Sequence, residues 1–212
     1  RYEPGSVFKI ITAAVGLEEN IVSPDTKDVF NCPGYHTVAG QTINCWKGRP
    51  GHGSQSLREA LCNSCNPAFM QLGEKIGAKT LYKYFEAFGL FSSTNLTSGD
   101  VSGNFWDLDD VGPVELATLS FGQRFGITPL QMITAVACIA NDGVLVQPKI
   151  IKNIINTDTG ATTNISTTEI RQVISKETSE KLLNMMESVV TVGTGSYGKV
   201  AGYSVAGKTG TS

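Results

Sequence analysis

The sequence predicts a single α+β domain. Apolar residues recur with helical spacing in several stretches, the clearest of them at 6–19 and 176–192. Other stretches, at 31–53 and 144–156, are rich in β-branched and turn residues, which is typical of short strands. The chain has 212 residues, enough to bury a substantial core within one domain.

Composition argues against several classes of function. The formal net charge is −2, charged residues make up 17% of the chain, and there is no basic run. Nothing therefore indicates a nucleic-acid partner. No apolar stretch reaches the roughly 18 residues that a membrane-spanning helix needs. The N-terminus also lacks the pattern of a signal peptide.

The first helix is expected to run from about Ser6 to Glu19. Pro4 and Gly5 mark its start, and it is apolar on so much of its surface that it should be central and buried. Lys9 follows Ser6 by three positions, so the two side chains share one helix face. A lysine whose pKa is lowered by burial and by cationic neighbours can activate a serine hydroxyl as a nucleophile. The helix N-terminus also offers free N–H groups to an oxyanion.

A second candidate group lies in a turn between two predicted helices, at 56–62 and 67–77. The first helix begins with a capping box, and a proline fits the start of the second. The turn between them reads Ser-Cys-Asn, and it can point Ser64 and Asn66 into a shared cleft. Serine and asparagine are also ordinary turn and cap residues, so position alone leaves both interpretations open.

The middle of the chain is predicted to be helical, with one long loop. Residues 81–88 carry apolar side chains at helical spacing and form a core stripe. Residues 91–112 are loop-rich, and the aspartates at 107, 109 and 110 are expected in a solvated acidic loop rather than in a metal site. Another apolar helix should follow Thr128 and end at Gly143. Arg124 can either reach a substrate carboxylate or lie on the surface.

The C-terminal part is expected to end in a strand. Ser175 is a suitable N-cap for the helix at 176–192. Residues 203–210 then have the pattern of a strand, although Gly207 and Gly210 are poor strand residues. Their presence suggests that another backbone approaches closely, and a peptide substrate lying along the strand edge would be such a backbone.

The cysteines allow three interpretations. They are Cys32, Cys45, Cys62, Cys65 and Cys138. Small buried thiols are the simplest interpretation. A metal site is not predicted, because a second close ligand pair is missing from the sequence and only His36 and His52 are available, both expected as polar loop residues. The third interpretation is a disulfide between Cys45 and either Cys62 or Cys65, which would lie beside Ser64 and gate activity by redox state.

Three motifs follow one another along the chain. They are Ser-x-x-Lys at 6–9, Ser-x-Asn at 64–66 and Lys-Thr-Gly at 208–210, and this order is the motif set of penicillin-binding proteins and class A β-lactamases. The residues around each motif, at 3–9, 63–67 and 206–212, resemble the transpeptidase domain of class B penicillin-binding proteins. The resemblance covers the whole chain. It implies an α/β sandwich, with a mostly antiparallel sheet flanked by helices and a helical subdomain.

The resemblance implies serine acyl transfer that needs no metal and no organic cofactor. Ser6 would attack the carbonyl of the penultimate D-alanine in a D-Ala-D-Ala stem peptide, and Lys9 would take its proton. Ser64 would relay that proton toward the leaving D-alanine with help from Lys208. Asn66 would bind the substrate backbone or steady Lys9. β-Lactam antibiotics would mimic the D-Ala-D-Ala end and trap the acyl-enzyme.

Substrate binding falls, by the same resemblance, on the last motif. Lys208, Thr209 and Thr211 would hold the terminal carboxylate of the peptide, and Gly210 belongs to the same substrate-binding segment. The backbone N–H groups of Ser6 and Thr211 would form an oxyanion hole, whose donors are typically worth about 2.7–4 kcal/mol each in barrier height.

Two other outcomes use the same motifs. A serine β-lactamase or D,D-carboxypeptidase would share the scaffold, and a penicillin-sensing receptor domain would be acylated without being an enzyme. No glutamate has the sequence context of the deacylating glutamate of class A β-lactamases. This observation favours the transpeptidase.

The setting of the domain is also an expectation from the resemblance. Related domains are tethered by an N-terminal membrane helix at the extracytoplasmic face of the cell membrane and work with a glycosyltransferase. Residues 1–212 begin five residues before Ser6 and end two residues after Lys-Thr-Gly, so we expect a fragment without its anchor and its C-terminal strands. The cysteine pattern suggests the sporulation-specific branch of a clostridial-type bacterium.

Overall fold

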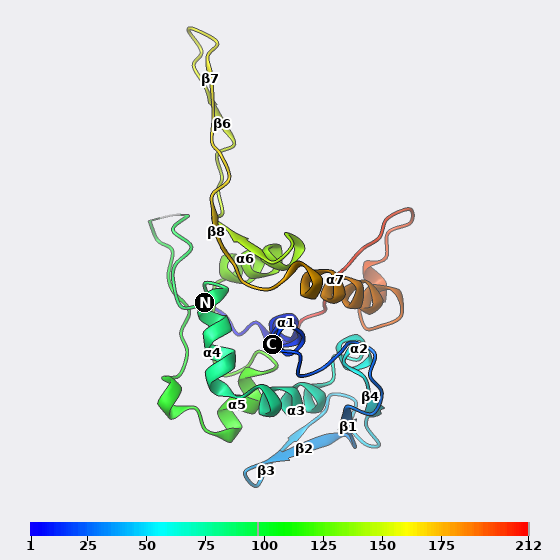
Figure 1. The fold of residues 1–212 in the computed structure, drawn as a ribbon. Coiled ribbons are helices and arrows are strands. Elements are labelled where there is room, and N and C mark those ends of the chain that lie inside the picture. The colour runs from blue at the N-terminus through cyan, green and yellow to red at the C-terminus, as the bar shows by residue number, and fades with distance from the viewer. Residues whose placement is uncertain (97, 212) are drawn as a thin grey trace.

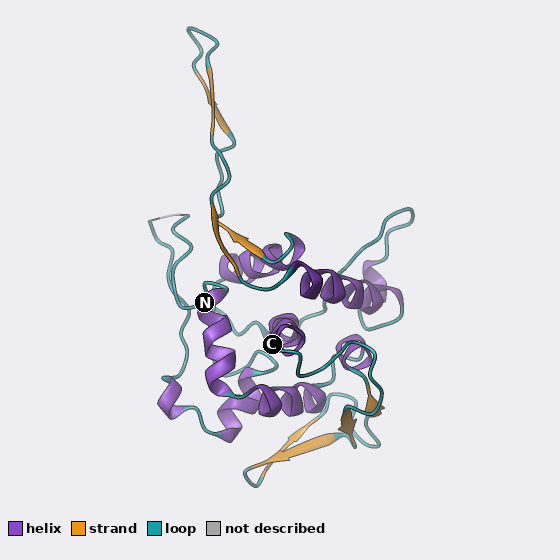
Figure 2. Ribbon diagram, in the orientation of Figure 1, coloured by secondary structure: helices purple, strands orange, loops and turns teal. Residues whose placement is uncertain are grey.

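A buried helix, α1 (Lys9–Glu18), lies at the centre of the computed structural model, which describes residues 1–96 and 98–211. Ser212, the last residue of the third motif's surroundings, lies outside the described residues. Every residue of α1 from Lys9 to Leu17 is buried. Helices α3 (Asn66–Ile76) and α7 (Lys176–Thr191) contact α1 from different sides (Figures 1 and 2). Burial on all sides explains why the sequence of α1 is apolar on most of its surface.

The first turn differs from the predicted single helix. Ser6 lies in a 3₁₀ turn, η1 (Gly5–Phe8), and the α-helix begins only at Lys9. No side chain caps η1, and a tighter turn is one way for an uncapped helix end to satisfy its free backbone groups. Gly5 has a φ of +56°, and its N–H donates to the carbonyl of Gly122 at 2.9 Å. The direction in which the chain enters this turn is therefore fixed by a neighbouring loop.

The other helices surround α1. α2 (Leu57–Cys62), α4 (Ala78–Ala87) and α6 (Pro129–Ala140) have bounds close to those predicted, whereas α5 (Pro113–Leu119) was not predicted. Two short 3₁₀ turns, η2 (Leu108–Asp110) and η3 (Ser196–Gly198), lie between longer elements. The predicted capping box at Ser56 is present, and Thr128 forms a second one at the start of α6. Such caps define where a helix begins, because they satisfy its first free N–H groups.

The strands form antiparallel pairs. β1 (Phe30–Cys32) pairs with β4 (Gly53–Gln55), and β2 (Tyr35–Val38) pairs with β3 (Gln41–Asn44), which confirms the short strands predicted between 31 and 53. β5 (Val144–Val146) pairs with β8 (Glu169–Gln172), and β6 (Asn153–Ile155) pairs with β7 (Thr162–Asn164) in a hairpin that projects from the body (Figure 1). Antiparallel pairs flanked by helices confirm the predicted α+β class. The described residues form separate two-stranded pairs rather than one larger sheet.

The strand predicted at 203–210 is not formed. None of the strand pairs among residues 1–96 and 98–211 includes this segment. Its Gly207 N–H instead donates to the carbonyl of Met186 in α7, at 3.2 Å. A strand exists only through hydrogen bonds to a neighbouring strand, so a strand-like sequence that pairs with none stays an extended segment.

A cluster of aromatic rings supports the turn that carries Ser6. Phe8 packs edge-on against Phe125 with ring centroids 4.7 Å apart, and against Phe85 at 5.1 Å. Phe105 stacks on Phe125 at 4.7 Å. Each such pair contributes roughly 0.5–1.5 kcal/mol beyond the burial of its area. The core stripe predicted at 81–88 thus anchors Phe8, two residues from Ser6.

The exposure of the loop side chains agrees with the expectation from the sequence. Asp107, Asp109 and Asp110 are exposed, as expected for a solvated acidic loop. Arg124 is also exposed, and its guanidinium lies 3.3 Å from the carboxylate of Glu115. This ion pair corresponds to the surface interpretation of Arg124.

Candidate active site

Ser6 and Lys9 lie one turn apart and meet. Lys9 Nζ is 2.8 Å from Ser6 Oγ. Ser6 is half-buried, whereas the side chain of Lys9 is completely buried at the start of α1. A hydroxyl that faces both solvent and a buried amine has the geometry of a nucleophile next to its base.

Lys9 also contacts the turn between α2 and α3. Its Nζ lies 2.6 Å from Asn66 Oδ1, 2.9 Å from the carbonyl oxygen of Ser64 and 3.2 Å from Ser64 Oγ. With Ser6 Oγ, four oxygen atoms surround an ammonium group that has only three protons to donate. The same set suits a neutral amine, which can donate its two N–H groups to the carbonyl oxygens of Ser64 and Asn66 and accept from one of the two hydroxyls.

Burial and a neighbouring charge favour that neutral form. Burial, followed by the positive charge of Lys208, lowers the pKa of Lys9 to about 7. Burial also lowers the pKa of Lys208 to about 8. Moving a charged amine out of water and placing a second amine close by both disfavour protonation. Near neutral pH, Lys9 is thus more often neutral than Lys208 and is the lysine available to act as a base.

The turn that carries Ser64 has a strained backbone. Ser64 adopts a φ of +50°, which is uncommon for a residue other than glycine, and it is 7% exposed. Its N–H donates to the carbonyl of Leu61 at 3.1 Å, and that of Cys65 donates to Ala60 at 3.0 Å. These bonds close α2 and turn the side chain of Ser64 toward Lys9. Such strain, of order 1–3 kcal/mol, is typically kept at functional sites.

Lys208 approaches the same turn from the other end of the chain. Its Nζ donates to Ser64 Oγ at 2.8 Å and lies 3.2 Å from Thr209 Oγ1, which is 3.0 Å from Thr194 Oγ1. Gly210 lies against the turn of Ser6, since a Cβ added there would be 2.6 Å from a methyl group of Val7. Thr211 is exposed. The structure therefore brings together all five residues predicted to be catalytic, and the segment predicted to bind substrate lies beside them.

A second set of contacts supports this turn and was not predicted from the sequence. Gln55 is buried and receives a hydrogen bond from Asn63 Nδ2 at 2.9 Å. The indole N–H of Trp46 donates to the carbonyl of Asn63 at 2.9 Å. Both residues belong to the segment between β1 and α2. Their contacts depend on how this segment folds back against Asn63, so no local sequence pattern predicts them.

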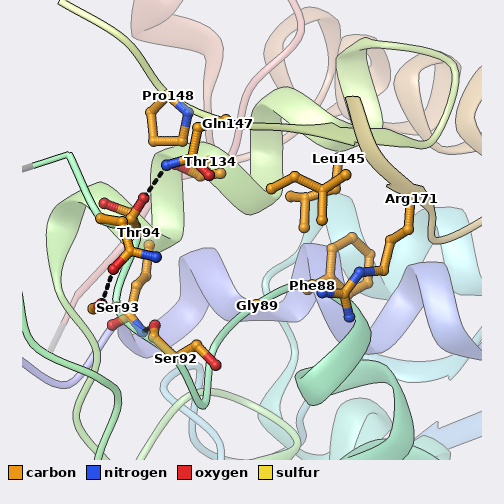
Figure 3. Close-up of a pocket in the computed structure, with 13 residues that line it drawn as sticks. Phe88, Gly89, Ser92, Ser93, Thr94, Thr134, Leu145, Gln147, Pro148 and Arg171 are labelled. Atoms are coloured by element: carbon orange, nitrogen blue, oxygen red, sulfur yellow. Dashed lines mark hydrogen bonds between the residues drawn. The ribbon is translucent and has the colours of Figure 1, made fainter. Parts of the chain in front are cut away.

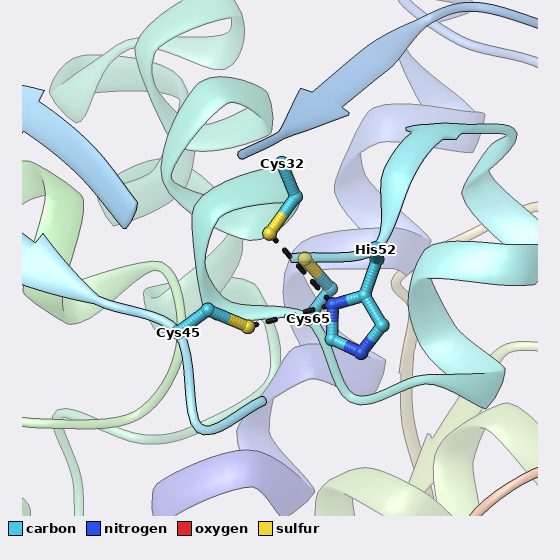
Figure 4. A group of neighbouring side chains, drawn as sticks. All are labelled: Cys32, Cys45, His52 and Cys65. Carbon is cyan, nitrogen blue, oxygen red and sulfur yellow. Dashed lines mark hydrogen bonds between the residues drawn. The ribbon is translucent and has the colours of Figure 1, made fainter. Parts of the chain in front are cut away.

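The disulfide that the third interpretation of the cysteines allowed is not formed, and the cysteines are arranged differently. All five are free thiols. The ligand atoms of Cys32, Cys45, Cys65 and His52 lie within 4.8 Å of one another (Figure 4). Cys62, the other proposed disulfide partner, is outside this group. The sequence argument against a metal site was wrong in its premise, because separate segments of the chain bring the ligand types together.

A separate pocket of about 300 Å³ lies between the end of α4, the loop after it, α6 and β5. Its walls include Phe88, Thr94, Gln131, Leu145 and Arg171 (Figure 3). None of the residues predicted to be catalytic lines it. The chemistry of the motifs is thus located elsewhere, at the junction of η1, the turn at Ser64 and Lys208.

Comparison with known proteins identifies the family of the chain. The family model "Penicillin binding protein transpeptidase domain" matches residues 1–212. The chain belongs to this family. Within the described part of the chain, no helix combines the length and the apolar composition needed to cross a bilayer.

Individual relatives cover nearly the whole chain. Stage V sporulation protein D of Bacillus subtilis is 45% identical over 212 residues, which are 99% of this chain and 32% of that protein. The D,D-transpeptidase domain of a peptidoglycan glycosyltransferase from Eggerthella lenta superposes with a TM-score of 0.89 at 31% identity, over 99% of this chain and 53% of that one. Penicillin binding protein 3 from Mycobacterium tuberculosis, solved in complex with ampicillin, gives 0.88 at 32% identity, over 99% and 47%. The chain spans about a third of the length of its first curated relatives.

Proposed function

We propose that this penicillin-binding transpeptidase domain is a serine D,D-transpeptidase that crosslinks peptidoglycan stem peptides through an acyl-enzyme on Ser6. One observation carries the proposal. Ser6 Oγ, Lys9 Nζ, Ser64 Oγ and Lys208 Nζ form a continuous chain with neighbouring atoms 2.8, 3.2 and 2.8 Å apart. Such a chain can remove a proton from a nucleophile and deliver one to a leaving group.

In the first step, Ser6 Oγ attacks the carbonyl carbon of the penultimate D-alanine. Lys9 Nζ takes the hydroxyl proton as the new C–O bond forms, and a tetrahedral oxyanion results. Ser64 Oγ gives its proton to the amine of the terminal D-alanine as the C–N bond breaks. Lys9 or Lys208 then returns a proton to Ser64. The products are an ester on Ser6 and free D-alanine.

In the second step, the amine of another stem peptide attacks the ester. A deprotonated group of the same proton chain, an amine or a hydroxyl, accepts the proton from the attacking amine. The Ser6 oxygen receives a proton as its ester bond breaks and the new amide forms. The groups that accepted protons in the first acyl transfer donate them in the second, and the donors accept, as expected for two related acyl transfers. A base whose pKa is near the working pH increases the rate of such a reaction by about 10²–10⁴-fold. The pKa of Lys9 is about 7, which is near neutral pH.

We assign substrate recognition to the segment 208–211. An ammonium group together with the hydroxyls of Thr209 and Thr211 suits the free carboxylate that ends a D-Ala-D-Ala peptide. The proposed oxyanion hole consists of the backbone N–H groups of Ser6 and Thr211. β-Lactams carry a similar carboxylate beside a reactive carbonyl, and the ampicillin complex of a structural relative supports acylation of this chain by them.

The relatives support a biological setting for this activity. A name such as stage V sporulation protein D supports a role in the peptidoglycan of a sporulating bacterium. Peptidoglycan is assembled outside the cytoplasm, so we place the domain at the extracytoplasmic face of the cell membrane. A glycosyltransferase is the partner that would supply glycan strands to be crosslinked.

The test is a crosslinking reaction with the full-length protein and a D-Ala-D-Ala stem pentapeptide on a soluble glycan. Wild-type protein should release D-alanine and form crosslinked dimers, whereas Ser6→Ala should form neither. Ser92→Ala, which changes an exposed serine, is the matched control and should be active. Release of D-alanine without dimers would contradict transpeptidation and indicate a carboxypeptidase. Acylation without any release would indicate a sensor domain.

A further inference from the structure

The group formed by Cys32, Cys45, Cys65 and His52 has the composition of a metal site. Each residue offers one ligand atom, and these four atoms lie within 4.8 Å of one another. His52 Nδ1 is 3.4 Å from Cys45 Sγ and 3.7 Å from Cys32 Sγ (Figure 4). The three cysteines are buried, and His52 is half-buried. Three thiols and one imidazole are a common ligand set for structural zinc.

The distances fit tetrahedral coordination. Bonds of about 2.3 Å to sulfur and about 2.0–2.1 Å to nitrogen place tetrahedral sulfur and nitrogen ligands roughly 3.6 Å apart, and two sulfur ligands roughly 3.8 Å apart. The two sulfur–nitrogen distances of 3.4 and 3.7 Å are close to that value. Sulfur atoms of a disulfide would be only about 2.05 Å apart, and all five cysteines are free thiols.

The environment of His52 also suits coordination. His52 is half-buried and its Nδ1 faces two of the thiols, and a neutral imidazole nitrogen is a common zinc ligand. Soft thiolate ligands select zinc over hard ions such as magnesium or calcium.

We propose that Cys32, Cys45, Cys65 and His52 bind one zinc ion and that this ion holds the segment 30–55 against the turn that carries Ser64 and Asn66. The ligands come from β1, from the loop that follows β3, from the residue before β4 and from the N-cap of α3. One ion would thus join segments that are distant in sequence. Zinc binding by this group is independent of the proposed function, whereas its effect on acylation rests on it.

The connection to the catalytic turn is direct. Cys65 is the middle residue of the motif Ser64-Cys65-Asn66. Gln55 Nε2 donates to Cys65 Sγ at 3.3 Å, while Gln55 Oε1 accepts from Asn63. Trp46, next to the ligand Cys45, holds the carbonyl of Asn63. Because Ser64 has a strained φ, the turn needs such external supports to keep its side chain on Lys9.

Zinc content tests the site itself. Full-length protein purified under reducing conditions should contain one zinc ion per chain by elemental mass spectrometry, and cobalt should replace it with the absorption bands of tetrahedral thiolate coordination. Cys45→Ser should weaken zinc binding by at least the roughly 10–100-fold that loss of an outer-shell partner costs. Cys62→Ser and Cys138→Ser change buried thiols outside the group and should bind zinc like the wild type.

A pair of variants guards against loss of folding. His52→Cys keeps four tetrahedral ligands and should retain zinc, whereas His52→Ala should lose it. Both variants remove the same imidazole, so a defect in folding alone would affect them alike. Zinc in His52→Ala at wild-type affinity, or wild-type protein that takes up neither zinc nor cobalt, would overturn the site. Non-reducing peptide mapping that finds a disulfide among Cys32, Cys45 and Cys65 in native protein would do the same.

The supporting role has a readout that does not depend on activity. Within residues 1–212, Trp106→Phe leaves Trp46 as the one tryptophan, and the difference in emission between this variant and Trp46→Phe/Trp106→Phe reports on the contact of Trp46 with Asn63. Removing zinc with a chelator should shift its emission and slow acylation by penicillin, and added zinc should restore both. Zinc that binds but changes neither signal would overturn the supporting role. If no variant or metal state is ever acylated, the proposed function fails while the zinc measurement still decides the site.

Discussion

Lys208 Nζ donates a hydrogen bond of 2.8 Å to Ser64 Oγ, although 144 positions separate the two residues. The same hydroxyl lies 3.2 Å from Lys9 Nζ, so it connects a buried lysine with a half-buried one. Both amines have a lowered pKa, about 7 for Lys9 and about 8 for Lys208. The site can therefore move protons near neutral pH without a histidine.

Replacing Lys9 should remove the base without removing the nucleophile. Lys9→Met keeps the length of the side chain and should slow acylation of Ser6 by benzylpenicillin by about 10²–10⁴-fold. Lys9→Arg should be as slow, because a guanidinium stays protonated. Stopped-flow measurement of the acylation rate constant checks both variants. Lys83→Met, at an exposed position, is the control and should leave the rate unchanged.

Acylation should depend on pH through both lysines. The rate should rise as pH increases through about 7, where Lys9 loses its proton, and fall above about 8, where Lys208 loses its own. The profile is then a narrow bell. Lys208→Met should remove the falling limb and move the rising limb to higher pH, because the charge of Lys208 lowers the pKa of Lys9. A flat profile between pH 6 and 9 would contradict these assignments.

Ser64 and Lys208 should act as a unit. Ser64→Ala interrupts the proton chain, and the second change, Lys208→Ala, then has little left to remove apart from binding of the carboxylate. We expect the double variant to be much less impaired than the product of the two single effects predicts. The acylation rates of the wild type, the two single variants and the double variant form a double-mutant cycle that measures this coupling. Strict additivity would mean that the bond between the two side chains has no part in acylation.

The turn of Ser6 should be sensitive to a glycine in a neighbouring loop. A Cβ at Gly122 would lie 2.0 Å from the carbonyl oxygen of Gly5, and Gly122 has a φ of +91°. Gly122→Ala should therefore displace η1, slow acylation and lower the free energy of unfolding by more than about 3 kcal/mol. Gly40→Ala is the control, because Gly40 also has a positive φ but faces open space. Its cost should be only about 1–2 kcal/mol. Urea unfolding measures both.

Local patterns predicted the site because each motif is short and lies at a boundary between elements. Ser6 and Lys9 face each other through one turn of chain, and the capping box at Ser56 fixes where α2 begins. The convergence of Lys208 on Ser64 was expected from the resemblance alone, since no spacing along the chain encodes a contact over 144 positions.

What the sequence did not predict depends on long-range folding. Cys32, Cys45 and Cys65 seemed too scattered for a shared site, but the pairing of β1 with β4 and the loop after β3 bring them together with His52. Residues 203–210 have the composition of a strand, yet strand structure depends on a partner and not on composition. The 3₁₀ geometry at Ser6 likewise follows from contacts of Gly5 with a distant loop.

The central claim is that Ser6 is a nucleophile that forms a long-lived acyl-enzyme. The most direct measurement is intact mass spectrometry of the full-length protein after incubation with benzylpenicillin, followed over hours and combined with peptide mapping. The account predicts one penicilloyl group per chain, located on Ser6, stable for hours and absent from Ser6→Ala. An adduct on another residue, an adduct that hydrolyses within seconds, or well-folded protein without any adduct would contradict it.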